Sequence, residues 1–349
     1  MLARISALFA SLLGALLLSV AGARASTLVI VGAGDGHGVG MSQDGALGYA
    51  EHGWSYSSIL AHYYTGTALG TAPAGAKVRV LIGNTVHVLP LETYVRGVIS
   101  AEMPASWPAA ALEAQAVAVR TYALTAHAGG SRFDVYSDTR SQVYRGPAAE
   151  TASTNAATIA TAGQIVTYDG APAITYFFAS SGGHTEDVQN AFGGAAEPWL
   201  VGVSDPYETK ASSWTLSMSF ASAAARLRGL VKGSLRGIEV LERGSSPRII
   251  SAAVLGSAGD TRVSGPELEG RLGLESTWAY FSVKHGSAVK AEPDHSGVAP
   301  AAGGSGAAGA GPAGPAGGAA PPVPTSPEGG VQGPAGSPGS TPAGGVVAG

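Results

Sequence analysis

Glu102 combines the features that suit a carboxyl group to acid and base chemistry. Pro104 disfavours the helical region for Met103, so the carboxyl group stands on a short, rigid connection between two helical patterns. Its sequence neighbours are apolar, which disfavours the charged form and raises the pKa toward neutral pH. The sequence therefore predicts a proton donor at Glu102. The alternative is a helix-terminal glutamate that caps Ser106 or pairs with Arg120.

Arg120 is expected inside the protein. The helix predicted over 108–128 is apolar or small on nearly every face, with Pro108 suited to its first position and two glycines after its end. A buried arginine requires an anionic partner. Glu113 lies two turns away, about 10 Å along the helix axis. Glu102 and an anionic ligand are the other candidates.

A glycine-rich loop precedes this region. Four glycines surround His37 within residues 34–40, so the backbone can approach a ligand closely and N–H groups stay free. No Gly-Lys-Ser/Thr follows, which excludes a P-loop. His37 is either a donor to a ligand or a turn histidine bonded to nearby backbone. Ser42 and Gln43 offer groups that suit sugar hydroxyl or acetamido groups, and that equally suit capping a helix beginning near Asp44.

Hydroxyl groups follow a strand predicted at 173–178. They belong to a short segment that contains Ser180, Ser181, Gly182 and Thr185. Such a segment forms either a polar rim where a chain substrate could lie, or a tight hairpin whose hydroxyl groups are satisfied internally. The spacing does not match Gly-x-Ser-x-Gly, so a serine hydrolase is weakly supported.

Metal and cofactor chemistry is not expected. The chain has no cysteine and therefore no thiolate site. The histidines at 37, 52, 62, 127 and 184 show neither HxxxH nor HxH spacing, which disfavours zinc. We expect neither a metal nor a cofactor.

The elements that must position these residues indicate a mixed α+β fold. Short β-branched or aromatic runs bounded by Gly or Pro predict strands at 27–31, 77–82 and 173–178. Helical patterns alternate with them irregularly, which argues against a doubly wound parallel sheet. We expect one domain over residues 26–289, with short strands around the buried, Ala-rich helix.

Both ends of the chain differ from this region. Residues 1–25 have the charged, apolar and small-residue order of a signal peptide, with an uncleaved anchor as the alternative. Residues 290–349 are rich in Gly, Ala and Pro, which predicts a disordered tail. The net charge is −4 without a basic cluster, so no nucleic-acid partner is expected.

Six stretches agree with one known family. They are GHGVGMSQDGA, LPLETYVRGVISAEMPASWPAAALEAQAVAVRTYAL, SDTRSQVYRG, SSGGHTEDVQNAFGG, PWLVGVSDPYE and RLGLESTW. They are distributed along the chain between Gly34 and Trp278. On these residues the sequence resembles the SpoIID/LytB domain family, the stage II sporulation protein D-like lytic transglycosylases of peptidoglycan.

This resemblance implies cleavage of peptidoglycan glycan strands next to N-acetylmuramic acid, with formation of a 1,6-anhydro end. The acid/base glutamate of the Ala-Glu-Met-Pro segment falls on Glu102. The arginine of the Val-Arg-Thr-Tyr stretch falls on Arg120, which we expect to orient Glu102 or to stabilise its ionised form. The groove for the glycan is expected to be lined by His37, Gln43, Gln115, Tyr122, Gln142, Ser180, Ser181, Gly182 and Thr185.

Other functions remain as alternatives. The same groove in a non-catalytic protein would bind glycan strands and enhance the action of a cell-wall amidase, and other cell-wall hydrolases are candidate partners. A hydrolase would need a second carboxylate, for which Asp138, Glu186 and Asp187 are candidates. A structural wall protein is a third alternative. In each case the protein is expected to be exported, to the cell wall or the extracellular space.

Overall fold

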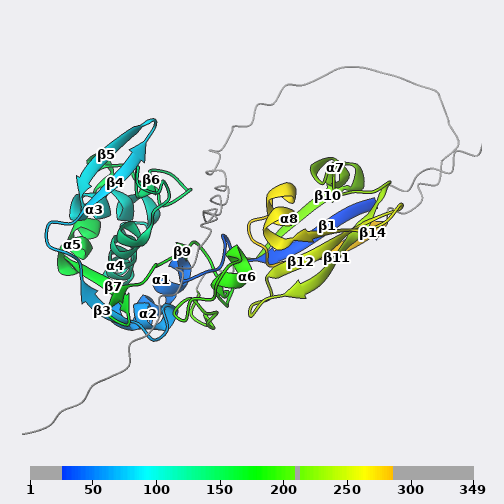
Figure 1. Cartoon of the computed structure of the whole chain (residues 1–349). Helices are drawn as coiled ribbons and strands as arrows, with labels where there is room; N and C mark the ends of the chain where they lie inside the picture. The colour runs from blue at the N-terminus through cyan, green and yellow to red at the C-terminus, as the bar shows by residue number, and fades with distance from the viewer. Residues whose placement is uncertain (1–25, 209–212, 286–349) are drawn as a thin grey trace, which may run out of the picture.

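A computed structural model describes residues 26–208 and 213–285 of the chain (Figure 1). The signal peptide predicted at 1–25 and the disordered tail predicted at 290–349 lie outside the described residues. Within them, no helix has both the length and the apolar character needed to cross a bilayer.

The described residues form a mixture of helices and short strands, as predicted. The helices are α1 (Gln43–Glu51), α2 (Tyr56–Tyr63), α3 (Leu91–Glu102), α4 (Ala109–Thr125), α5 (Ala152–Ala160), α6 (Val188–Phe192), α7 (Phe220–Arg226) and α8 (Gly265–Leu272), with one 3-10 turn at Pro147–Ala149. The strands are β1 (Ser26–Ala33), β2 (Met41–Ser42), β3 (Ala68–Thr71), β4 (Lys77–Ile82), β5 (Thr85–Pro90), β6 (Val135–Tyr136), β7 (Gln164–Tyr168), β8 (Ala171–Pro172), β9 (Phe177–Phe178), β10 (Ser213–Ser219), β11 (Leu235–Arg243), β12 (Ile249–Gly256), β13 (Thr261–Ser264) and β14 (Ala279–His285).

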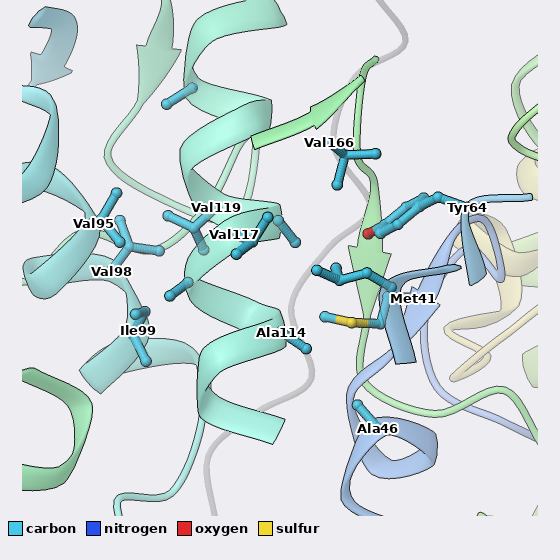
Figure 2. Packing of buried hydrophobic residues seen from close by; sticks show 14 of the residues in the cluster. Met41, Ala46, Tyr64, Val95, Val98, Ile99, Ala114, Val117, Val119 and Val166 are labelled. Atoms are coloured by element: carbon cyan, nitrogen blue, oxygen red, sulfur yellow. The ribbon is translucent and has the colours of Figure 1, made fainter. Parts of the chain in front are cut away.

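The Ala-rich helix α4 is the centre of the first hydrophobic core, as its sequence predicts. Figure 2 shows Val117 and Val119 on α4 between Val98 and Ile99 of α3 on one side and Val166 of β7 on the other. Small side chains let the neighbouring helices approach α4 closely, and burial on all faces explains why the helix carries so few charges. This packing fixes α3, whose last residue is Glu102.

A second hydrophobic core lies in the other half of the molecule (Figure 1). It is formed by two three-stranded sheets, ordered β10-β1-β14 and β11-β12-β13, together with α7 and α8. The first strand, β1, is antiparallel to both β10 and β14, with Leu28 opposite Met218 and Val283. The described residues therefore begin in this half, enter the first core after β1 and return to the second half at β10.

Two separate clusters of buried side chains do not confirm the single domain expected from the sequence. The halves meet where the glycine-rich loop leaves β1. The backbone N–H of Gly36 donates to the carbonyl of Glu275 at 2.8 Å. Arg248, in the turn between β11 and β12, donates from Nη1 to the carbonyls of Ser181 and His184 at 3.2 and 3.1 Å.

Candidate functional site

Glu102 is the last residue of α3, not a residue of a non-helical link as the sequence suggested. Met103 is extended, with φ −127° and ψ 143°, because Pro104 excludes the helical region there. Glu102 is half-buried, and its Oε1 accepts a hydrogen bond from the N–H of Val143 at 2.6 Å. The negative end of the helix dipole also disfavours a carboxylate at this position.

The pKa of Glu102 lies above its usual value. Burial raises the pKa, whereas the N–H of Val143, the side chain of Gln43 and the charge of Arg145 lower it. Burial outweighs the three stabilising contacts, so the group keeps its proton closer to neutral pH. The contacts nevertheless provide support for the charge once the proton has left. This balance suits a residue that first donates a proton and then accepts one.

Gln43 is brought to Glu102 by the start of α1. Ser42 caps this helix by accepting a hydrogen bond from the N–H of Gly45 at 3.1 Å, so Gln43 is the first helical residue. The Gln43 side chain is 8% exposed. Its interaction with Glu102 lowers the pKa of that carboxyl group, although its Nε2 makes no hydrogen bond of standard geometry. A donor is therefore available beside the carboxyl group.

Two other predicted groove residues are in the interior. Gln142 is 1% exposed and donates to the carbonyl of Val119 on α4 at 3.3 Å, which fixes the backbone next to Val143. Gln115, on α4, is fully buried, and neither atom of its amide has a hydrogen-bond partner in the described part of the chain. The structure does not place either side chain on an open surface.

An aromatic row extends from α4 to α6. Tyr122, predicted to bind substrate, lies 5.9 Å from Tyr176, which lies 5.0 Å from Phe192, measured between ring centroids. His37 is next, 5.0 Å from Phe192. All four side chains are half-buried. Tyr176 and Phe192 were not singled out in the sequence, although their position in motif-rich stretches was a usable signal.

His37 is a neutral turn histidine in this structure. Its Nδ1 accepts the N–H of Val39 at 3.0 Å, and the ring also bonds to the carbonyl of Phe177. Burial, and then the charge of Arg248, lower its pKa to about 3. With both ring nitrogens engaged, the alternative of a turn histidine bonded to backbone fits better than a donor to a ligand.

The hydroxyl groups expected at a polar rim are buried instead. Ser180 donates to Glu208, and the single hydroxyl proton of Ser181 is shared between Glu208 and Asp205, whose Oδ2 lies 2.8 Å from Oγ. The hydroxyl of Thr185 accepts the N–H of Val203 at 2.8 Å. These groups face the protein, which agrees with the alternative of internally satisfied hydroxyl groups. Burial raises the pKa of Asp205 to about 6.

Gly182 also has a packing role. It has φ +74°, and a Cβ there would lie 2.9 Å from the backbone nitrogen of Gly34. Its missing side chain therefore allows the segment to pack against the end of the glycine-rich loop.

The expected partners of Arg120 were wrong. Its guanidinium, fully buried, forms a bidentate pair with Glu92, with both N–O distances 2.8 Å, and donates to the carbonyl of Gln164 at 2.9 Å. Neither Glu113 nor Glu102 contacts it. Glu92 is in the first turn of α3 and also accepts the N–H of Gly163 at 3.2 Å. Arg120 thus ties α4 to the beginning of α3, twelve residues long, whose other end carries Glu102.

The three carboxylates considered for a second catalytic role are engaged elsewhere. Asp138 forms an exposed ion pair with Arg140, with an N–O distance of 2.7 Å. The hydrogen bond from Arg140 lowers the pKa of Asp138. Asp187 accepts the N–H of Gly202 at 2.6 Å. Glu186 is bound by Ser245, Ser246 and Asn190, and although burial alone would raise its pKa, these hydrogen bonds hold it below the usual value.

Potential metal ligands do not cluster in residues 26–208 and 213–285. No group of three or more His, Asp or Glu side chains there could hold a metal ion.

Comparison with known proteins places these residues in a family. The family model described as SpoIID, stage II sporulation protein, matches residues 83–168, which include Glu102 and Arg120. An uncharacterised protein of Brachyspira hyodysenteriae is 42% identical over 139 residues, 39% of this chain and 38% of that protein. Stage II sporulation protein D of Bacillus subtilis is 29% identical over 227 residues, 60% and 65% of the two chains.

A further relative is the amidase enhancer of Bacillus subtilis, 35% identical over 140 residues, 40% of this chain and 19% of that protein. The alignments thus span less than two thirds of the length of each of these relatives.

The fold and the site together define a mixed α+β protein. In it, α3 packs against the buried helix α4 and carries at its end Glu102, a carboxyl group whose pKa is raised. The family match and the named relatives narrow this further: residues 83–168 match the SpoIID family, and the chain is similar to stage II sporulation protein D of Bacillus subtilis.

Proposed function

We propose that this protein is a lytic transglycosylase that cleaves peptidoglycan glycan strands next to N-acetylmuramic acid. The observation that carries the proposal is the setting of Glu102, where burial raises the pKa while Gln43, Val143 and Arg145 stand ready to stabilise the ionised form. Burial favours the protonated carboxyl group, and the nearby donors and cation stabilise the carboxylate, so the same group can act first as an acid and then as a base. Its position in the SpoIID match supports the same role.

The proposed reaction uses one carboxyl group twice. Glu102 donates its proton to the glycosidic oxygen as the bond from C1 of N-acetylmuramic acid to that oxygen breaks. The C6 hydroxyl of the same sugar then attacks C1, and its proton passes to the Glu102 carboxylate. A C1–O6 bond replaces the glycosidic bond, no water is consumed, and Glu102 ends protonated as it began.

The engagement of the alternative carboxylates supports this route over hydrolysis. Hydrolysis with two carboxyl groups needs the second one free to attack the sugar or to activate water. Asp138 is bound to Arg140, and Glu186 is held by serine hydroxyl groups near the second core. The half-buried rings of Tyr122, Tyr176 and Phe192 are candidates for contact with the apolar faces of sugars.

The test compares wild-type protein, Glu102→Gln and Glu113→Gln on purified peptidoglycan. Glu113 is a matched control because it is also half-buried and its pKa is also raised by burial. We expect 1,6-anhydromuramyl ends by mass spectrometry with wild type and Glu113→Gln, and none with Glu102→Gln. Wild-type-like products from Glu102→Gln would overturn the mechanism. Reducing ends instead of anhydro ends would identify a hydrolase.

A non-catalytic role as an enhancer of a cell-wall amidase is the second candidate, favoured by the similarity to the amidase enhancer of Bacillus subtilis. Purified amidase would then release peptides from peptidoglycan faster when this protein is added. Under this alternative, Glu102→Gln would stimulate the amidase as well as wild type does, and neither protein would produce anhydro ends.

Export to the cell wall or the extracellular space is part of the same proposal. It rests on the charged, apolar and small-residue order of residues 1–25. Cell fractionation and N-terminal sequencing of the mature protein test it. We expect the protein outside the cytoplasm with cleavage after Ala25, and an uncleaved protein in the cytoplasmic fraction would contradict export.

A further inference from the structure

A small cavity lies where the two cores meet, and the proposed transglycosylase mechanism does not use it. Its volume is about 60 Å³, and its walls are mostly apolar, including Phe192 of α6, Ile250 of β12 and Pro266 of α8. Such a volume holds roughly four to six water-sized groups. Arg248 and Glu269 are the charged residues on the side of the second core.

Arg248 is an incompletely satisfied buried cation. It is 2% exposed, and only its Nη1 donates hydrogen bonds, to two carbonyls. Its Nε and Nη2 have no partner in the described residues. Burial lowers its pKa to about 10, so the guanidinium stays charged at neutral pH. The rings of Phe178 and Trp278 lie 5.6 and 5.9 Å from the guanidinium carbon and stabilise its charge in part. They accept no hydrogen bond from Nε or Nη2, so the two unpaired N–H groups still call for an anionic partner.

Glu186 is not that partner. It lines the same cavity, but its two oxygens already accept from Ser245, Ser246 and Asn190. It influences Arg248 only through its charge.

Glu269 lines the cavity from α8 and does not contact Arg248 either. The two residues are close enough for each charge to change the pKa of the other. No ion pair joins them among the described residues, and no described side chain donates to the Glu269 carboxyl group. Opposite charges that line one cavity without touching leave room for a ligand between them.

We propose that this cavity binds a small free α-amino acid, with its carboxylate on Arg248 and its ammonium group on Glu269. The zwitterion satisfies both unpaired groups at once. A simple anion would leave Glu269 without a partner, and a simple cation would leave Arg248 without one. The apolar walls fit a side chain no larger than a methyl group.

Calorimetric titration of the mature protein with glycine, L-alanine and D-alanine tests this site. Acetate and methylammonium serve as half-ligands that carry only one of the two charges. We expect saturable binding of at least one amino acid, with an affinity at least about tenfold higher than that of either half-ligand. Absence of saturable amino-acid binding, or equal binding of acetate, would overturn the proposal.

Glu269→Gln is the decisive variant because Glu269 is half-buried and the substitution preserves its shape. It should weaken amino-acid binding about tenfold or more while leaving acetate binding equal or stronger. Unchanged amino-acid binding would contradict the assignment of the ammonium group. Glu102→Gln is the control, and it should bind amino acids as wild type does whether or not the protein cleaves glycans.

The pH dependence gives a second readout. Burial raises the pKa of Glu269 to about 7, with Arg248 lowering it and Asp35 raising it. The other titratable groups at the cavity are a neutral His37 and an ionised Glu186. As pH rises through about 7, Glu269 loses its proton, so alanine should bind more tightly and acetate more weakly. The alanine trend should disappear in Glu269→Gln, and a trend that persists there would count against this site.

Discussion

At the scale of single residues, the acidity of Glu102 depends on a balance that substitution can move. Arg145 is exposed and contributes a positive charge that lowers the pKa of Glu102. Arg140 is also exposed, but it is paired with Asp138. The two arginines therefore offer a test of whether Glu102 is the titrating group in catalysis.

Arg145→Gln should raise the pKa of Glu102, because removal of a nearby cation disfavours the carboxylate. If the protonated form starts the reaction, activity falls as pH rises through this pKa. The falling limb of the pH–rate profile should therefore move to higher pH in the variant. The rate of anhydro-end formation, measured between pH 5 and 9, gives the position of this limb. In the control variant Arg140→Gln the limb should stay at the wild-type pH. A limb that stays in place in Arg145→Gln would mean that another group titrates.

Tyr176→Leu should weaken glycan binding more than it slows chemistry. The Tyr176 ring lies between those of Tyr122 and Phe192, so its loss interrupts the aromatic row. A lost aromatic contact is worth about 0.5–1.5 kcal/mol, which corresponds to an increase in KM of up to about tenfold. Steady-state kinetics with soluble glycan strands separates KM from kcat. Tyr280→Leu, exposed on β14, is the control, and equal effects of both variants would exclude the row as a binding surface.

The raised pKa of Glu102 could be predicted from the sequence, whereas the partner of the buried Arg120 could not. The apolar neighbours of Glu102 and Pro104 act locally, so their effect is visible in the sequence. Arg120 was correctly expected to be buried and to need an anion. Glu92, however, is 28 residues away in the chain, and the two meet only because α3 packs against α4. Patterns within one short stretch of sequence cannot predict a contact between residues on two different helices.

At the scale of elements, we infer that the ion pair of Arg120 and Glu92 holds α3 in position against α4. Glu92→Gln leaves the Arg120 charge buried without its carboxylate. Because the Glu92 side chain is 36% exposed, we expect a loss of about 2–4 kcal/mol in the free energy of unfolding, below the range for fully buried pairs. Urea denaturation followed by circular dichroism measures it.

The matched control for this variant is Glu113→Gln, which should change stability by less than about 0.5 kcal/mol. If Arg120 acts only through α3, the folded fraction of Glu92→Gln should keep the pH–rate profile of wild type with a reduced rate. A displaced pH profile would instead mean that Arg120 influences the charge of Glu102 directly.

The strand predicted at 173–178 illustrates why some elements were only partly found. Only Phe177–Phe178 forms a strand, β9, paired with β2. The preceding carbonyls of Ile174 and Tyr176 accept hydrogen bonds from the side chains of Trp199 and Tyr64, both at 2.9 Å. The Tyr176 carbonyl also accepts the backbone N–H of Met41 at 3.1 Å, next to the β2–β9 pairing. At Ile174, a side chain distant in sequence satisfies a backbone group that a longer strand would otherwise use.

At the scale of the whole molecule, the two cores could not be read from local patterns. The strand at 27–31 was predicted correctly, but its partners β10 and β14 lie far along the chain. Hydrophobic periodicity finds strands and does not reveal which ones pair over such distances. The resemblance to one family in stretches distributed along the chain favoured a single domain, whereas the family model itself covers only 83–168.

The contact between the halves depends on the close approach of the glycine-rich loop to Arg248. Gly38 has φ +87°, and a Cβ there would lie 2.5 Å from Nε of Arg248. Gly75 has φ +70° with nothing within 4 Å of a Cβ. Alanine at Gly75 therefore introduces only backbone strain, about 1–2 kcal/mol. Alanine at Gly38 introduces that strain and also displaces the guanidinium.

Gly38→Ala should consequently lower the free energy of unfolding by roughly 1–3 kcal/mol more than Gly75→Ala, the usual range for overpacking. The displaced Arg248 would lose its hydrogen bonds to the carbonyls of Ser181 and His184. Calorimetry should therefore show the two cores melting at more widely separated temperatures in Gly38→Ala than in Gly75→Ala. Hydrogen exchange should speed up around residues 180–186 in Gly38→Ala alone. Equal behaviour of the two variants would mean that the loop and Arg248 do not hold the halves together.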